Sequence, residues 1–137
     1  MFRSSPIPLW VTLFLMLLAL SMSSQVYIFY LDHGFLSEAG ISTEGAPNLN
    51  ILYATAGRAL AMIAATVLAI LLQNPQAYLV ILLMSMVREG QETIIQPLYP
   101  YANSPASPAV MFALHAVILA IEIAAFIAVM RKLRSTQ

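Results

Sequence analysis

The chain has 137 residues, of which 61% are hydrophobic and 9% charged, and its formal net charge at pH 7 is zero. Because a soluble domain has about 25% charged residues, this composition predicts a single polytopic membrane domain covering residues 1–137. The chain has no cysteine, which excludes disulfides, thiolate metal sites and thiol catalysis, and no basic run long enough to make nucleic acid an expected partner.

Long apolar stretches predict an all-α fold, a bundle of four transmembrane helices. The expected spans cover about residues 8–31, 51–72, 75–96 and 108–130. Pro8, Pro75 and Pro108 suit the first turn of a helix, where a missing N–H does no harm. Ser107 is the expected N-cap of the last span.

Two longer connections separate these spans. Asp32-His33-Gly34 should end the first helix, with Gly34 in the left-handed position, and residues 35–50 should form a loop. The prolines in residues 97–107 exclude a helix interior, so a second loop is expected there.

The first span has two interpretations. Met1-Phe2-Arg3 and the apolar run after it resemble a secretory signal, with a passable cleavage pattern at Ala19-Leu20-Ser21. Apolar character resumes at residues 26–31, which makes the segment long enough to span the bilayer. An uncleaved first helix is therefore favoured.

Basic residues set the expected orientation. Arg3 and the cluster of Arg131, Lys132 and Arg134 are the only basic residues outside the spans, so both termini should be cytoplasmic. The loop between Asp32 and Glu44 carries only acidic charges and should lie outside. The expected location is a bacterial-type inner (cytoplasmic) membrane.

A polar layer is expected in the outer half of the bundle. Charges inside a spanning helix are costly in hydrocarbon and mark functional sites. From the helical rise, Gln25 and His115 lie roughly 9 Å below the outer ends of their helices, Arg58 roughly 12 Å and Glu122 roughly 20 Å. The candidate ligand-binding residues are Gln25, Arg58, Arg88, Glu89, Glu92, His115 and Glu122.

Two interpretations of this layer are open. In the first, Arg58 and Arg88 pair with Glu89, Glu92 and Glu122 and only fix the helix register. In the second, which is favoured, the layer binds a ligand. Its near-zero charge suits a neutral head group, quinone-like or lipid-like, better than a phosphate. No metal is expected, because Glu89-x-x-Glu92 lacks the histidine of a dimetal Glu-x-x-His motif.

An alanine row on the last span predicts an oligomer. Ala116, Ala120, Ala124 and Ala128 recur every four residues, largely opposite His115. Such rows let helices approach closely, so a contact with an identical or different subunit is expected there.

Residues 48–50, Asn-Leu-Asn, are followed by Ala56-Gly57-Arg58-Ala59-Leu60-Ala61. This pattern resembles the start of the second helix in small DoxX-like bacterial membrane proteins. The resemblance implies a four-helix membrane fold and assigns no functional residues.

The favoured function is therefore non-enzymatic: binding of a quinone or lipid, alone or as a subunit of a larger complex. One alternative is a purely structural accessory subunit of a membrane complex. Another is a membrane enzyme acting on a lipid-like substrate, with Glu92 or His115 as the acid or base.

Overall fold

The structure, a computed structural model, describes residues 7–100, 103 and 106–135. These residues form helices and the turns between them, as the sequence predicted for the fold class. The helices are α1 (Leu9–Leu31), α2 (His33–Glu38), α3 (Ala46–Leu72), α4 (Pro75–Leu98) and α5 (Pro108–Arg134).

Three of these helices, α1, α3 and α5, are long and apolar enough to cross a membrane. Large apolar side chains on their outer faces are open to the surroundings, with Leu17 65%, Leu71 75% and Val117 58% exposed. So much exposed apolar surface suits lipid and is rare on a soluble monomer. Together these features indicate a multi-pass membrane protein.

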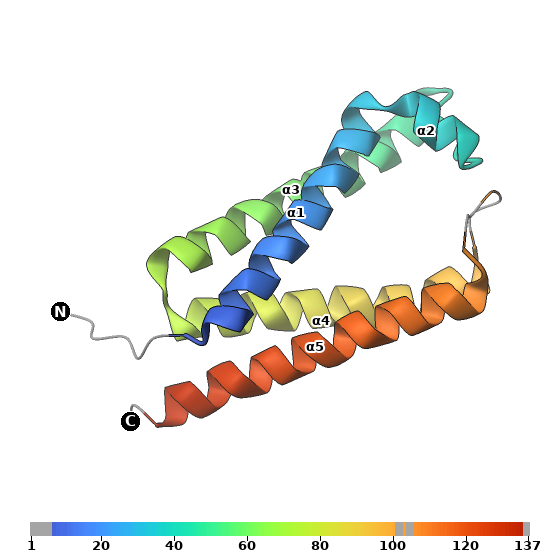
Figure 1. Cartoon of the computed structure of the whole chain (residues 1–137). Helices are drawn as coiled ribbons and strands as arrows, with labels where there is room; N and C mark the ends of the chain where they lie inside the picture. The colour runs from blue at the N-terminus through green and yellow to red at the C-terminus, as the bar shows by residue number, and fades with distance from the viewer. Residues whose placement is uncertain (1–6, 101–102, 104–105, 136–137) are drawn as a thin grey trace.

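The four long helices form two antiparallel pairs, α1 with α3 and α4 with α5 (Figure 1). The pairs meet at the end where both termini lie, and they diverge toward the end that carries α2 (Figure 1). We call these the terminal end and the α2 end. The expected four-helix bundle is thus not confirmed, since the pairs pack together at only one end.

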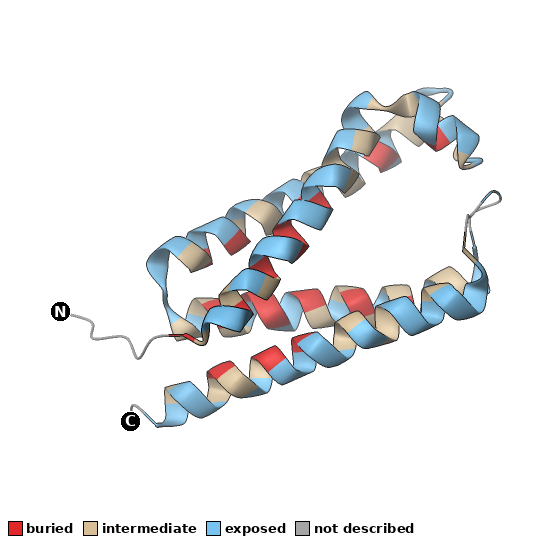
Figure 2. Cartoon of the chain, viewed as in Figure 1, coloured by how far each residue is buried: buried red, intermediate tan, exposed pale blue. Residues whose placement is uncertain are grey.

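The apolar core lies at the terminal end and joins the two pairs. Figure 2 shows buried positions along the inner faces of the helices. The central cluster consists of Ile7, Val11, Leu15, Leu18, Ala69, Tyr78, Ile81, Leu82, Ala125 and Val129. Fully buried Tyr78 adds polar contacts, because its hydroxyl lies 3.0 Å from Oγ1 of Thr12 and accepts from Nε2 of Gln73 at 3.1 Å.

The connection between α1 and α3 differs from the prediction. Helix α1 ends at Leu31 as expected, but the next residues form α2, whose first turn is capped by Asp32 Oδ1 accepting from Phe35 N at 3.1 Å. Gly34 therefore lies inside a helix, and the left-handed glycines are Gly40 and Gly45. Helix α3 begins at Ala46 rather than at Ile51, because Pro47 is tolerated in the first turn.

Caps define the other helix ends. Asn74 Oδ1 accepts from Gln76 N at 2.9 Å to begin α4, and Ser107 begins α5 as predicted. Helix α4 extends past Gln96 to Leu98, with Pro97 in its last turn, where the proline removes only one helical hydrogen bond. Helix α5 reaches Arg134 instead of ending at Met130, since basic residues are favourable in a last turn.

Candidate functional site

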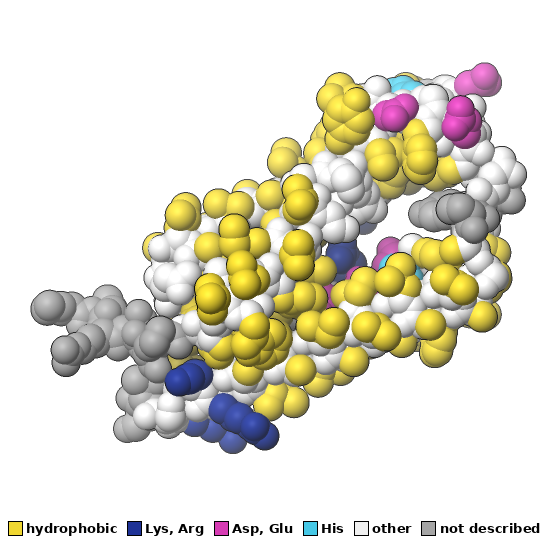
Figure 3. Space-filling model, in the orientation of Figure 1, with side chains coloured by type: hydrophobic (Ala, Val, Ile, Leu, Met, Phe, Trp, Pro, Cys, Tyr) yellow, Lys and Arg dark blue, Asp and Glu magenta, His cyan; other side chains and the backbone are white. Residues whose placement is uncertain are grey.

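The diverging pairs leave a hollow between them, which we call the cleft. Figure 3 shows basic, acidic and histidine side chains facing into it, surrounded by apolar surface. Helices α4 and α5 carry a group of polar residues beside the cleft, and we call this group the polar wall. The polar wall consists of Ser85, Arg88, Glu89, Glu92, His115 and Glu122.

The deepest contact of the polar wall joins Ser85 of α4 to Glu122 of α5. Both residues are buried, Ser85 at 2% and Glu122 at 0% exposure. The serine hydroxyl donates to Oε1 of Glu122 at 2.5 Å. The second oxygen, Oε2, is buried and has no hydrogen-bond partner in the described part of the chain.

Glu89 lies one turn after Ser85 and contacts the side chains of His115 and Arg88. Its Oε1 lies 2.5 Å from Nδ1 of His115, and its Oε2 accepts from a guanidinium N–H of Arg88 at 3.5 Å. The Glu89 side chain is only 4% exposed and that of His115 12%. Nε2 of His115 and Nε of Arg88 are buried without a partner among the described residues.

Toward the α2 end, Glu92 continues the polar wall. Its Oε2 accepts from Nε2 of Gln96 at 3.0 Å, one turn further along α4. Both side chains are partly buried. Thr93 does not add a free group, since its hydroxyl donates to the carbonyl of Glu89 at 2.7 Å.

The predicted pairing of Arg58 with Glu89 or Glu92 is not found. Within the described residues Glu89 forms an ion pair with Arg88 and a hydrogen bond with His115. Arg58 lies exposed on α3. Since α3 packs along α1 and α4 along α5, the arginine and the glutamates belong to different pairs.

Helix α1 contributes less than its polar residues suggested. Ser23 and Ser24 donate to carbonyls of their own helix, to Ala19 at 2.8 Å and Ser21 at 2.7 Å. This local bonding satisfies the hydroxyls without a partner helix. Gln25 is partly buried and, together with Arg58, belongs to the pair that faces the polar wall.

One residue of the polar wall was left out of the candidate set. Ser85 precedes Glu89 by four residues, which places both on one face of α4. That spacing was the available signal. Its partner Glu122 was included, but only the structure shows that the two side chains meet.

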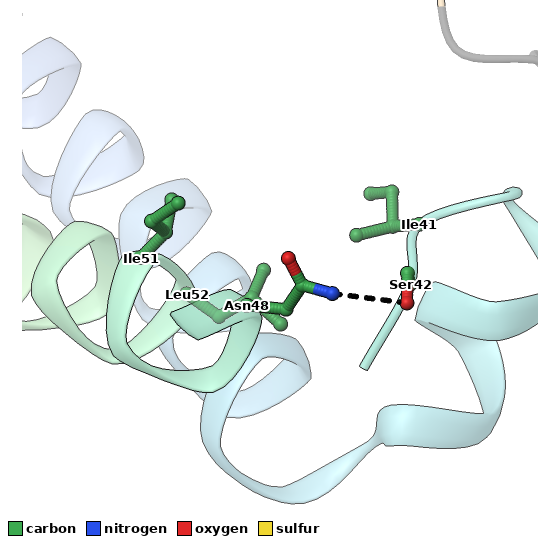
Figure 4. Close-up of a pocket in the computed structure, with 5 residues that line it drawn as sticks. All are labelled: Ile41, Ser42, Asn48, Ile51 and Leu52. Atoms are coloured by element: carbon green, nitrogen blue, oxygen red, sulfur yellow. Dashed lines mark hydrogen bonds between the residues drawn. The ribbon is translucent and has the colours of Figure 1, made fainter. Parts of the chain in front are cut away.

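A small separate pocket lies at the α2 end, between the α2–α3 connection and the start of α3 (Figure 4). Its volume is about 190 Å³, and it is lined by Ile41, Ser42, Asn48, Ile51 and Leu52. The amide N–H groups of Asn48 already donate to Ser42 Oγ at 3.1 Å and to Glu44 O at 2.8 Å. The polar wall therefore has more buried polar atoms without a hydrogen-bond partner than the lining of this pocket.

Within the described residues, no group of three or more histidine, aspartate or glutamate side chains is placed to hold a metal ion. Fold and site together define a multi-pass helical membrane protein with a polar-walled cleft. The chain matches no family model, no curated protein and no solved structure. The resemblance of residues 48–61 to DoxX-like proteins stays a prediction.

Proposed function

We propose that the protein binds an amphiphile, quinone-like or lipid-like, whose neutral head group contacts the polar wall and whose tail lies between the helix pairs. One observation carries this proposal. Arg88 Nε, His115 Nε2 and Glu122 Oε2 are buried without a partner among the described residues, and the fourth such atom, His33 Nε2, lies away on α2. Buried polar atoms nearly always have a hydrogen-bond partner, and a bound head group would supply it.

The charges of the polar wall favour a neutral head group. The positive charge of Arg88 lies against Glu89, and Glu92 and Glu122 add two more acidic side chains nearby. A phosphate here would meet these carboxyl groups at short range and in a low dielectric, where like charges repel strongly. A carbonyl or hydroxyl group would use the same donors and acceptors without this repulsion. Arg58 and Gln25 of the facing pair can add contacts from the other side.

The proposed setting is a bundle of four spans in a bacterial-type inner membrane. Helix α4 packs antiparallel along the apolar helix α5, which supports its crossing the bilayer beside α5 (Figure 1). It has 24 residues, a length of about 36 Å from the helical rise, against about 30 Å of hydrocarbon. Arg131, Lys132 and Arg134 follow the last apolar turn of α5 and support cytoplasmic termini.

The test is mass spectrometry of the amphiphiles that co-purify in mild detergent. We compare wild type, Arg88→Leu in the polar wall, and Arg131→Leu at the exposed end of α5 as the matched control. Wild type and Arg131→Leu should carry one amphiphile enriched over bulk lipid, and Arg88→Leu should lose it. Absence of enrichment in wild type would overturn the binding proposal.

A structural role is the second candidate. It is favoured by the two side-chain contacts that join α4 to α5, Ser85–Glu122 and Glu89–His115. In that case the polar wall holds one helix pair together, and the protein is an accessory subunit of a larger membrane complex. A wild-type protein that folds and assembles without any enriched amphiphile would support this second role.

A further inference from the structure

The two ring nitrogens of His115 have different surroundings. Nδ1 lies 2.5 Å from Oε1 of Glu89, while Nε2 is buried and has no partner in the described part of the chain. A carboxylate has no hydrogen to donate, so the hydrogen in this contact sits on Nδ1. In the neutral imidazole, Nε2 then carries the lone pair and accepts a hydrogen bond.

Arg88 has the opposite hydrogen-bonding character and lies on the same carboxylate. Both side chains contact the same carboxylate, His115 through Oε1 and Arg88 through Oε2 of Glu89. A guanidinium group only donates hydrogen bonds, and Nε of Arg88 is free of partners among the described residues. Glu89 thus holds a side chain with a free acceptor at one of its oxygens and a side chain with a free donor at the other. This pattern matches a hydroxyl group, which donates one hydrogen bond and accepts another.

We propose that the ligand is held by a hydroxyl group, whose O–H donates to Nε2 of His115 and whose oxygen accepts from Arg88. The inference rests on the proposed amphiphile binding and names the form of the head group. It selects a quinol over the corresponding quinone, because a quinone carbonyl would place its lone pair against that of His115. Sites built to bond a hydroxyl reject analogues that lack it.

The same hydroxyl chemistry occurs in a second kind of amphiphile, diacylglycerol, so the experiment has two arms. In the first, the purified full chain in detergent micelles is titrated with a short-chain benzoquinol, kept reduced under argon, and with its benzoquinone. In the second, it is titrated with a short-chain diacylglycerol and with its O-acetylated form. Each arm compares a hydroxyl compound with a partner that lacks the hydrogen, and calorimetry gives the two dissociation constants.

In the arm that binds, the hydroxyl compound should bind at least about tenfold more tightly than its partner. This ratio corresponds to one hydrogen bond to Nε2 of His115, which the compound without the hydrogen leaves unpaired. His33→Leu, which removes the other histidine of the chain, should keep this ratio. His115→Leu should bring the ratio close to one. His115→Lys should invert it, because an ammonium group donates to a carbonyl and accepts nothing.

Three results would overturn the inference. Equal binding of both members of a pair by wild type, or tighter binding of the quinone, excludes the hydroxyl contact while leaving amphiphile binding intact. A ratio unchanged in His115→Leu assigns the selectivity to other residues. Failure to bind any of the four compounds, with no co-purified amphiphile, overturns the proposed function together with this inference.

Discussion

Single residues of α4 show how the polar wall is built. Ser85, Glu89 and Thr93 follow one another at intervals of one turn and are all under 10% exposed, at 2%, 3% and 8%. This face of α4 packs on α5, so its polar side chains must find partners there or within the helix. Ser85 and Glu89 reach α5, whereas Thr93 donates to the backbone of its own helix.

The Ser85–Glu122 contact leads to the first prediction. Ser85→Ala leaves both oxygens of a fully buried carboxyl group without a partner among the described residues. The free energy of unfolding should fall by about 1–3 kcal/mol, the usual penalty for a stranded buried polar group. Thermal unfolding in detergent micelles measures the change.

Ser24→Ala is the matched control, because Ser24 is exposed and donates to the Ser21 carbonyl within α1. Its effect should stay within about 0.5 kcal/mol. Glu122→Gln, which keeps an acceptor for Ser85, should be milder than Ser85→Ala. Equal unfolding temperatures for Ser85→Ala and Ser24→Ala would show that the buried contact adds nothing to stability.

At the scale of helices, the sequence predicted existence and order better than boundaries. The four long helices and the Ser107 cap all follow from local rules on apolar length, proline and capping, and the structure has them close to those places. The start of α3 was missed because Pro47 and the glycines before it indicated a loop, although a first turn tolerates proline. Partner choice was also missed. It depends on summed side-chain packing between helices, which no local rule contains.

The depth of the polar residues was also predictable, because it depends only on local helix geometry. The rise per residue is fixed in a helix, so Gln25, Arg58 and His115 could be placed at similar heights from the sequence alone. Which side chain meets which depends on how the helices pair. The sequence therefore predicted a polar centre but paired Arg58 with Glu89 or Glu92, where the structure has His115 on Glu89.

Tyr78 joins the two helix pairs and gives the second prediction. Its buried hydroxyl lies 3.0 Å from Thr12 Oγ1 on α1 and accepts from Gln73 at the end of α3. Tyr78→Phe removes both contacts and should lower the free energy of unfolding by about 1–2 kcal/mol. Tyr30→Phe is the control, because the more exposed Tyr30 hydroxyl makes a long contact of 3.4 Å within its own helix pair. If Tyr30→Phe proves the more destabilising change, the junction does not depend on Tyr78.

The alanine row of α5 gives the third prediction. Ala120 and Ala124 are exposed in the single chain, while Ala125 of the same helix is fully buried in the core. Small residues on a lipid-facing surface allow another helix to approach closely. Ala120→Leu and Ala124→Leu should therefore weaken crosslinking to another subunit in native membranes and leave the unfolding temperature nearly unchanged.

Ala125→Leu distinguishes assembly from folding. Extra methyl groups at a filled core position typically destabilise a protein by about 1–3 kcal/mol, so this variant should unfold at a lower temperature. A wild-type chain that crosslinks to nothing in native membranes would contradict the expected oligomer.

At the scale of the whole molecule, two features of the chain oppose each other. The core at the terminal end holds both helix pairs together, whereas toward the α2 end the pairs diverge around polar side chains (Figures 1 and 3). Apolar side chains cover the outer faces, so polar groups of α4 are turned toward α5 and the cleft. Helix α4 is too polar to count among the apolar spans, and under the proposed four-span topology this arrangement would keep its charges away from lipid.

The crossing of α4 decides the topology and gives the last prediction. With four spans, the turn at Gln73-Asn74 and the C-terminus lie on one side, and the connections around residues 39–45 and 99–107 lie on the other. With α4 on the membrane surface, only α1, α3 and α5 would cross, and the C-terminus would move to the side opposite the Gln73-Asn74 turn.

A reporter that is active on one side only, inserted after Gln73 or fused after Gln137, separates these arrangements. We expect both reporters to be cytoplasmic, because Arg131, Lys132 and Arg134 favour that side, and a reporter inserted at Glu44 to be outside. Opposite sides for the Gln73 and Gln137 reporters would exclude α4 as a span and would place its charged residues at the membrane surface.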